Sequence, residues 1–291
     1  MNEQNNFSYG ASHEALRKSV ASKMYIASII FLALFIVANI VDAVVNIAFF
    51  GMLEINSEIY LQATRVAAMV YSPTGYTIVA LVKLLIPIAC VFTLIYAIKL
   101  RTTKCANPVD HVFKTRHASS ILFIFALFTV VQCAMFMFAF SFNMFKADNY
   151  DFVATACSFF GITELYNYFG LAEFFAGLTG MFGKIGVTVL VDLVVAAYAL
   201  AQLLLYKWTK SFLIALADIV SSGIAQMQER PPFKLSVAVS LANIVLAIFM
   251  VLNGSPVAAI LNVALASYLL SNGFYLRRVK KNITEAGKIA Q

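Results

Sequence analysis

Long apolar stretches alternate with short polar or basic stretches along this chain. Six of the apolar stretches reach or approach the length of about 20 residues that a helix needs to cross a bilayer. They cover about 24–50, 76–98, 119–145, 185–206, 235–252 and 257–276. The pattern predicts an all-α fold, a polytopic transmembrane helical bundle of six spans arranged as three hairpins.

The two ends of the chain are more polar than its middle. Residues 1–23 form a polar N-terminal segment, residues 24–276 the six-span membrane domain, and residues 277–291 a basic tail. The first apolar stretch is far longer than the roughly 7–15 apolar residues of a secretory signal, and no small-residue cleavage motif ends it. We therefore expect the first span to be retained.

Two stretches outside the six spans carry helical patterns of their own. Apolar residues in 51–75 recur at helical spacing opposite charged ones, which predicts an amphipathic helix on the outer membrane surface. Apolar residues in 210–228 also recur at helical spacing. That second stretch predicts either a surface helix on the cytoplasmic side or an extension of the fourth span.

Residues 152–182 are apolar, aromatic and rich in glycine, and could form a seventh span. The basic residues favour six spans, because 17 of the 21 Lys and Arg residues then lie on one side of the membrane. That side is predicted to be the cytoplasm, so both termini are expected there. We expect 152–182 to be a surface or re-entrant helical segment on the outer side; a re-entrant path needs protein cover for its backbone.

The composition is that of a protein dissolved in lipid. Hydrophobic residues make up 62% of the chain and charged residues only 12%, against about 25% charged in a soluble domain. The net charge of +7 is explained by Lys and Arg on cytoplasmic loops. We therefore expect the lipid bilayer as a partner, in the plasma (cytoplasmic) membrane, and no nucleic acid.

Motifs that carry chemistry are absent from the sequence. The four cysteines show no Cys-x-x-Cys spacing, so we interpret them as small apolar residues rather than disulfide or metal sites. Neither the His-Glu-x-x-His nor the Gly-x-Ser-x-Gly template occurs. The sequence therefore predicts no metal, no cofactor and no catalytic residue, and it weighs against an enzyme.

Three charged residues lie inside predicted spans, and they are the sharpest functional signal in the chain. Asp42, Lys83 and Asp192 each stand roughly eight residues from the outer end of their span. At about 1.5 Å per residue, all three lie roughly 12 Å below the outer surface. Because ionisable residues in a membrane are costly, such a cluster is a functional-site hypothesis. Lys83 would offset one or both aspartates.

Polar neighbours extend the predicted site. Asn39 and Asn46 share a helix face with Asp42, and Thr188 stands one turn before Asp192. Pro87 has no N–H, so the carbonyl of Lys83 loses its helical partner. Two aspartates and one lysine leave a formal charge of −1, which favours a bound cation or a shared proton. The prediction is a substrate or ion site between the first, second and fourth spans.

Two other interpretations remain open. The cluster can instead be a structural ion pair that fixes the order of the helices. In that case the chain is a non-enzymatic membrane subunit or assembly factor of a larger complex. Its partner is then another protein or a further copy of the same chain. An intramembrane or lipid-modifying enzyme is a third possibility, but the sequence offers no nucleophile with an adjacent base.

Overall fold

The computed structural model describes residues 2–55, 73–103, 169–222, 228–252 and 256–289, together with single residues between 114 and 137. All regular structure in these ranges is helical, which confirms the predicted all-α fold. The helices are α1 (Asn2–Val20), α2 (Lys23–Ile55), α4 (Pro73–Thr102), α7 (Phe169–Ser222), α8 (Phe233–Leu252) and α9 (Pro256–Ile289).

Four helical segments among the described residues are long and apolar enough to cross a membrane. They are Lys23–Val44, Leu84–Thr102, Gly177–Ser221 and Ala259–Lys288; Phe233–Ile248 of α8 is a shorter apolar helix. Large apolar side chains on these helices stay outside the core: Leu193 and Val194 are 64% and 62% exposed. Because such a surface is unfavourable in water, it indicates lipid contact. The stretches 51–75 and 119–145 lie largely outside the described residues, so six spans and three hairpins remain predictions.

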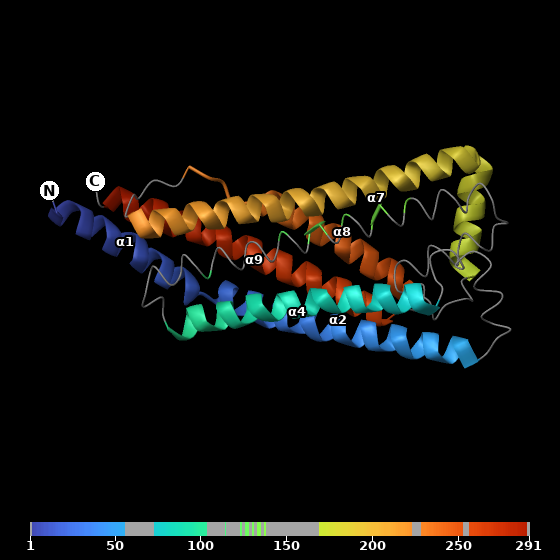
Figure 1. The fold of residues 1–291 in the computed structure, drawn as a ribbon. Helices are drawn as coiled ribbons and strands as arrows, with labels where there is room; N and C mark the ends of the chain where they lie inside the picture. The colour runs from blue at the N-terminus through green and yellow to red at the C-terminus, as the bar shows by residue number, and fades with distance from the viewer. Residues whose placement is uncertain are drawn as a thin grey trace.

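The long helices run side by side, and both chain ends lie at the same end of the bundle (Figure 1). Helix α9 is central, since it packs against α1, α2 and α8, and α2 also packs against α4. Helix α7 packs against α8 and α1. A close approach at Gly273 allows the α8–α9 contact, because a Cβ atom there would lie 2.8 Å from the Cβ of Ser236.

Basic residues gather where the helices approach the two termini, and we call this part of the bundle the basic end. It is defined by Lys23, Lys99, Arg101, Lys207, Lys210, Arg277 and Arg278, with Trp208 among them. Lys, Arg and Trp in this arrangement are typical of a membrane boundary. The guanidinium Nη1 of Arg101 donates to the carbonyl of Val20 at 3.1 Å, which ties α4 to the end of α1.

The helices are longer than a bilayer requires. Helix α9 has 34 residues, about 51 Å at 1.5 Å per residue, against a hydrocarbon thickness of about 30 Å. Helix α7 runs from its kink at Gly183 to Ser222, which is longer still. The last part of α7 shows that the predicted helix at 210–228 continues the fourth span as far as Ser222; residues 223–227 lie outside the described ranges.

The long helices bury apolar side chains in two separate cores along their length. The first lies within the membrane-crossing part and joins α2, α4, α7, α8 and α9; its largest members include Leu32, Phe35, Leu205 and Tyr268. The second lies at and beyond the basic end and joins α1 with the ends of α7 and α9, through Leu16, Phe212, Leu216 and Ile283 among others. The chain therefore has two apolar cores on the same helices. We name them from the predicted membrane boundary at the basic end, the first as the membrane core and the second as the extramembrane core.

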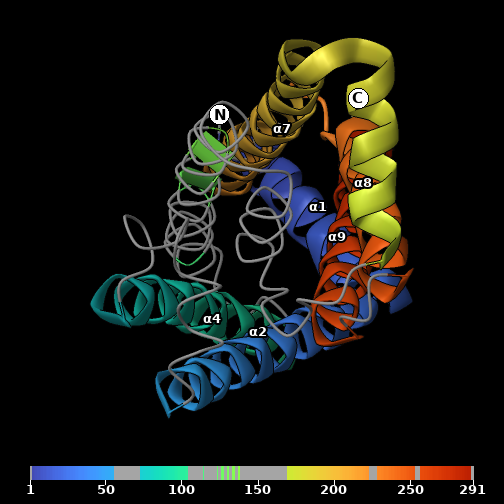
Figure 2. The same ribbon diagram turned by 90° about the vertical axis from the view of Figure 1, so that its right-hand side faces the viewer.

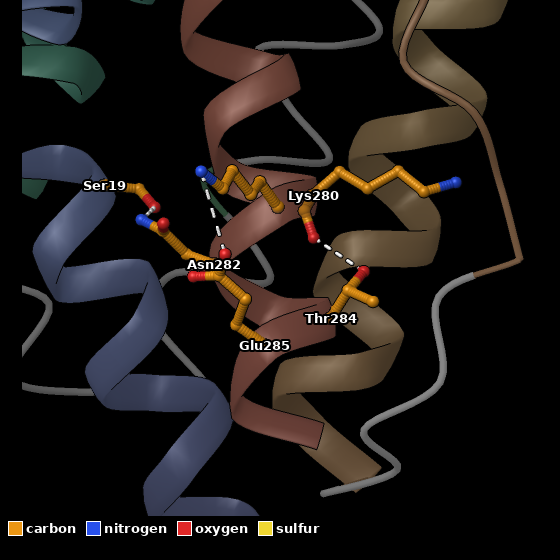
Figure 3. A network of polar contacts seen from close by, with 6 residues as sticks. Ser19, Lys280, Asn282, Thr284 and Glu285 are labelled. Atoms are coloured by element: carbon orange, nitrogen blue, oxygen red, sulfur yellow. Dashed lines mark hydrogen bonds and ion pairs between the residues drawn. The ribbon is translucent and has the colours of Figure 1, made fainter. Parts of the chain in front are cut away.

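The sequence analysis missed helix α1 and the folded state of the basic tail. Leu16 and Ser19 of α1 are fully buried, and α9 continues through the tail to Ile289. The amide Nδ2 of Asn282 donates to the hydroxyl of Ser19 at 2.8 Å, which joins the two ends of the chain (Figure 3). Ser22 begins α2 as a helix cap, since its hydroxyl accepts the N–H of Tyr25 at 3.4 Å.

Helix α7 is broken at Gly183, whose φ is 69° and ψ 168°. Residues with a side chain rarely adopt this conformation. The part of α7 before the kink runs across the end of the bundle, whereas the part after it runs along the bundle (Figures 1 and 2). This crossing segment covers the last residues of the predicted outer segment 152–182. The surface or re-entrant path of 152–182 stays a prediction, since residues 152–168 lie outside the described ranges.

Replacing Gly183 with alanine should destabilise the protein, by about 1–3 kcal/mol, because alanine must adopt the strained conformation or straighten the helix. Gly180→Ala is the matched control. Neither glycine has a neighbour within 4 Å of an added Cβ, and only Gly183 has a positive φ. Thermal unfolding in mild detergent should therefore give a lowered midpoint for Gly183→Ala and an unchanged or raised one for Gly180→Ala. Equal midpoints would contradict the observed kink.

Truncating Leu16 tests the extramembrane core. Leu16→Ala should cost about 2–5 kcal/mol because it leaves a cavity among buried apolar side chains. Lys18→Ala, on the exposed face of the same helix, should leave the unfolding midpoint nearly unchanged. Proteolysis at the N-terminal helix should also become faster for Leu16→Ala alone. If both variants unfold like the parent protein, α1 is not part of the folded core.

Candidate functional site

The predicted intramembrane charges lie on three different helices. Asp42 on α2 and Asp192 on α7 are both half-buried, and both take part in polar or electrostatic interactions. Lys83 lies on α4 and Asn46 on α2, but their side chains lie outside the described part of the structure. The direct pairing of Lys83 with the aspartates therefore stays a prediction.

Two of the predicted polar neighbours use their donors within their own helices. The amide Nδ2 of Asn39 donates to the carbonyl of Phe35 at 2.8 Å, and the hydroxyl of Thr188 donates to the carbonyl of Lys184 at 2.9 Å. Each side chain still has an oxygen that can accept a hydrogen bond or face a cation. Thr188 is thus suited to present an acceptor to a ligand, whereas Asn39 can offer both its oxygen and its second amide N–H.

The helices that carry these charges are not equally close. Helices α2 and α4 pack together, so Asp42 and Lys83 lie on neighbouring helices. Among the described residues, α7 packs on α8 and α1 and has no comparable contact with α2 or α4. Figure 2 shows α7 and the α2–α4 pair on different sides of the bundle. Helices α2 and α4 are thus neighbours, whereas α7, which carries Asp192, has its main contacts elsewhere; the three-residue site stays a prediction.

A second polar group, which the sequence analysis did not identify as a site, connects α7 and α8. The hydroxyl of Tyr198 donates to Oδ1 of Asn243 at 3.1 Å, and Nε2 of Gln202 donates to the hydroxyl of Tyr198 at 3.0 Å. Asn243 also donates to the carbonyl of Val239 at 2.8 Å. Gln202 is 1% exposed and Asn243 is 0% exposed. These residues form a chain of hydrogen bonds inside the bundle.

The network is nearly but not completely satisfied. Within the described structure, Oε1 of Gln202 is buried and accepts no hydrogen bond. An unsatisfied buried acceptor is costly, so this oxygen is the one place in the network where a water molecule or a donor group would be stabilised. The sequence signal for the network was the presence of Gln202 and Asn243 in otherwise apolar spans. Their pairing depends on the α7–α8 packing.

A cavity of about 100 Å³ lies where the membrane core meets the extramembrane core. Helices α2, α4, α7 and α9 supply most of its wall, and Lys114 adds a charged side chain. Apolar residues such as Leu32, Leu213 and Leu216 form one part of the lining, and Ser28, Thr93 and Asn272 supply polar groups. Four tyrosines complete the lining: Tyr25, Tyr96, Tyr268 and Tyr275. The mixture is typical of a small-molecule site.

Tyrosine packing fixes the shape of this cavity. The rings of Tyr25 and Tyr275 lie with centroids 4.6 Å apart, and the hydroxyl of Tyr25 donates to the carbonyl of Ala97 at 3.0 Å. These contacts join α2 to α9 and α4 respectively. The hydroxyl of Ser28 donates to the carbonyl of Tyr25 at 2.8 Å. Several lining groups are therefore held rigidly by contacts between helices.

Comparison with known proteins finds no relative of this chain. No family model, no curated protein and no solved structure matches the chain. Among the described residues, no three His, Cys, Asp or Glu side chains are grouped in a way that could hold a metal ion. The regular structure of the described residues is helical, and several of the helices are apolar enough to be compatible with a membrane protein.

A double-mutant cycle tests the α7–α8 network. Tyr198→Phe removes the hydroxyl that joins Gln202 to Asn243, and Asn243→Leu removes its acceptor. The two substitutions should show a coupling free energy of about 0.6–1.7 kcal/mol in unfolding experiments in detergent, as hydrogen bonds between membrane helices do. Ser221→Ala, which removes an exposed hydrogen bond within α7, combined with Tyr198→Phe, is the control pair. Its effects should simply add.

Proposed function

We propose that this chain is a polytopic membrane protein that carries or conducts a small solute or ion, with Asp42, Lys83 and Asp192 in its binding site. The observation that carries the proposal is the half-buried position of both aspartates on long, otherwise apolar helices. Ionisable side chains inside membrane spans are costly and are found mainly along substrate, ion or proton pathways. Asn39, Asn46 and Thr188 complete the proposed site.

An interruption in α4 supports the proposal. Helix α4 contains Pro87, which leaves the carbonyl of Lys83 without its usual helical donor. Broken membrane helices near the substrate site are a recurring feature of transporters, because the freed backbone groups can bind the ligand. Pro87 stands one helical turn from Lys83, so this interruption falls close to a charged residue of the proposed site.

The charge of the site favours a cation or a proton. Two carboxylates and one ammonium group leave a formal charge of −1, and the acceptor oxygens of Asn39 and Thr188 add to the negative potential. A cation bound there would offset the cost of burying the second carboxylate. The basic end is proposed to face the cytoplasm, with both termini there, since Lys and Arg concentrate on cytoplasmic loops.

Neutralising the aspartates tests the transport proposal. In liposomes containing purified protein, Asp42→Asn should reduce uptake of the responsive ion or solute at least tenfold, while the protein stays folded. Asp192→Asn should do the same if both carboxylates share the site. Asp218→Asn is the control, because Asp218 is exposed near the end of α7. Uptake that is normal in Asp42→Asn would rule out this version of the proposal.

A second candidate function is favoured by the extramembrane core. Helices α1, α7 and α9 extend beyond the basic end and pack into a separate apolar unit, which would offer a folded surface to another protein. The chain would then be a non-enzymatic subunit or assembly factor, and the intramembrane charges a structural ion pair. Crosslinking in native membranes would separate the two: a stoichiometric partner attached to α1 or α9 favours this function. Full transport activity of the isolated chain contradicts it.

A further inference from the structure

We infer that an anionic phospholipid binds at the basic end, with its phosphate on Arg277 of α9. The surface concerned, which we call the boundary patch, consists of Phe233, Phe274, Arg277 and Arg278. It lies where α8 begins and where α9 reaches the predicted membrane boundary. No residue of the boundary patch belongs to the proposed transport site, so the inference does not depend on that function. Lipid binding can be measured without a transport assay.

The exposed face of α9 changes from apolar to basic within one helical turn. Ile260, Val263 and Phe274 are 61%, 49% and 39% exposed, and helical spacing places all three on one side of α9. Arg277 and Arg278 are exposed and follow Phe274 at three and four residues, on the same side. A phospholipid in a bilayer has the same order, since its acyl chains lie in the hydrocarbon and its phosphate lies at the boundary. This face of α9 therefore complements a phospholipid along its length.

Helix α8 carries the same change. It packs against α9 and begins at the basic end, where Lys234 is exposed. Leu241 and Val245, 58% and 65% exposed, follow Lys234 on the same side of α8. On two packed helices the exposed side chains thus change from basic to apolar at the same end of the bundle. This agreement indicates a membrane boundary at the level of the boundary patch.

Contacts between α8 and α9 hold Arg277 in place. The guanidinium carbon of Arg277 lies 4.9 Å from the centroid of the Phe233 ring. The ring of Phe274 packs edge-on against the same Phe233 ring, with centroids 4.9 Å apart. Gly273 permits this approach, since a Cβ atom there would lie 3.7 Å from the Phe233 ring. A stacked arginine loses less freedom on binding, and its planar group matches two phosphate oxygens. Arg277 is therefore pre-organised for a phosphate group.

The charge of the boundary patch attracts an anion. Among the residues that the structure describes, neither Arg277 nor Arg278 pairs with a carboxylate, whereas the next turn of α9 pairs Lys281 with Glu285 at 3.7 Å. Basic residues at a membrane surface are attracted to anionic lipids. The ammonium group of a zwitterionic head group would be repelled by the second arginine. Free phosphate would use the arginines alone, whereas a phospholipid would also cover the exposed ring of Phe274.

Native mass spectrometry of the purified full chain in a neutral detergent measures this binding directly. Phosphatidylglycerol should bind at least tenfold more tightly than phosphatidylcholine with the same acyl chains, because only phosphatidylglycerol lacks the ammonium group. One phosphatidylglycerol molecule per chain should be bound at the lowest lipid concentrations. Glycerol phosphate, which has the phosphate but no acyl chains, should not compete at concentrations where phosphatidylglycerol saturates the site.

Substitutions separate the proposed contact from general attraction to a basic surface. Arg277→Gln should weaken phosphatidylglycerol binding at least tenfold, as expected for loss of a charge-assisted bidentate contact. Arg277→Lys should also bind less tightly than the parent protein, because an ammonium group cannot replace the planar guanidinium. Lys288→Gln is the matched control. It removes an exposed cation from the same helix, about 16 Å farther along at 1.5 Å per residue, and should leave the affinity unchanged.

Replacing Phe233 tests its role as a positioning residue. Phe233→Leu keeps an apolar side chain beside Gly273 but removes the ring beneath the guanidinium, so it should weaken binding about threefold. In the Arg277→Gln background, Phe233→Leu should have no further effect on binding, because the ring acts through Arg277. A ring that only stabilises the α8–α9 contact would instead weaken binding equally in both backgrounds.

Three results would overturn the inference. Equal affinity for the two phospholipids, or equal phosphatidylglycerol binding by the parent protein and Arg277→Gln, would show a nonspecific lipid shell. Competition by glycerol phosphate would show a site for free phosphate. A photocrosslinking residue in place of Arg278 that attaches to protein rather than lipid in native membranes would show that another chain covers this face. Asp42→Asn should leave lipid binding unchanged, so failure of the transport proposal and failure of this inference are distinguishable.

Discussion

The helices of this chain are longer than a bilayer is thick, and the arrangement of the two cores follows from this mismatch. Helices of about 50 Å are longer than about 30 Å of hydrocarbon, and the Lys and Arg residues of the basic end indicate that α7 and α9 extend past the bilayer there. There they need a different way to bury their apolar faces, and α1 supplies it. The extramembrane core therefore follows from helices that continue without a break from the lipid into the surrounding water.

Helix α9 connects these two environments. It packs against α2 and α8 in the membrane core and against α1 beyond it, so a displacement of α9 would be felt in both. The tyrosine-lined cavity lies at the change between the two cores, where the packing partners of α7 and α9 also change.

The candidate sites differ in how far the sequence could predict them. Asp42, Lys83 and Asp192 were visible because a charge in an apolar stretch stands out locally, whatever it contacts. The hydrogen-bond chain through Tyr198 and the cavity beside Lys114 were not, because tyrosine, asparagine and leucine are ordinary residues at a helix face. Only the relative placement of four helices brings the lining residues together, and no local spacing encodes that placement.

The helical class and the approximate positions of the apolar helices could be predicted from local composition, because transfer of a side chain into lipid depends on that side chain alone. It did not determine the role of the two chain ends. In α1 the buried face includes Ser12 and Ser19, so no apolar stripe marks it as a packing surface. The bond between Ser19 and Asn282 joins residues 263 positions apart. That contact, like the two cores, comes from the three-dimensional arrangement of the helices, since packing depends on how distant surfaces fit together.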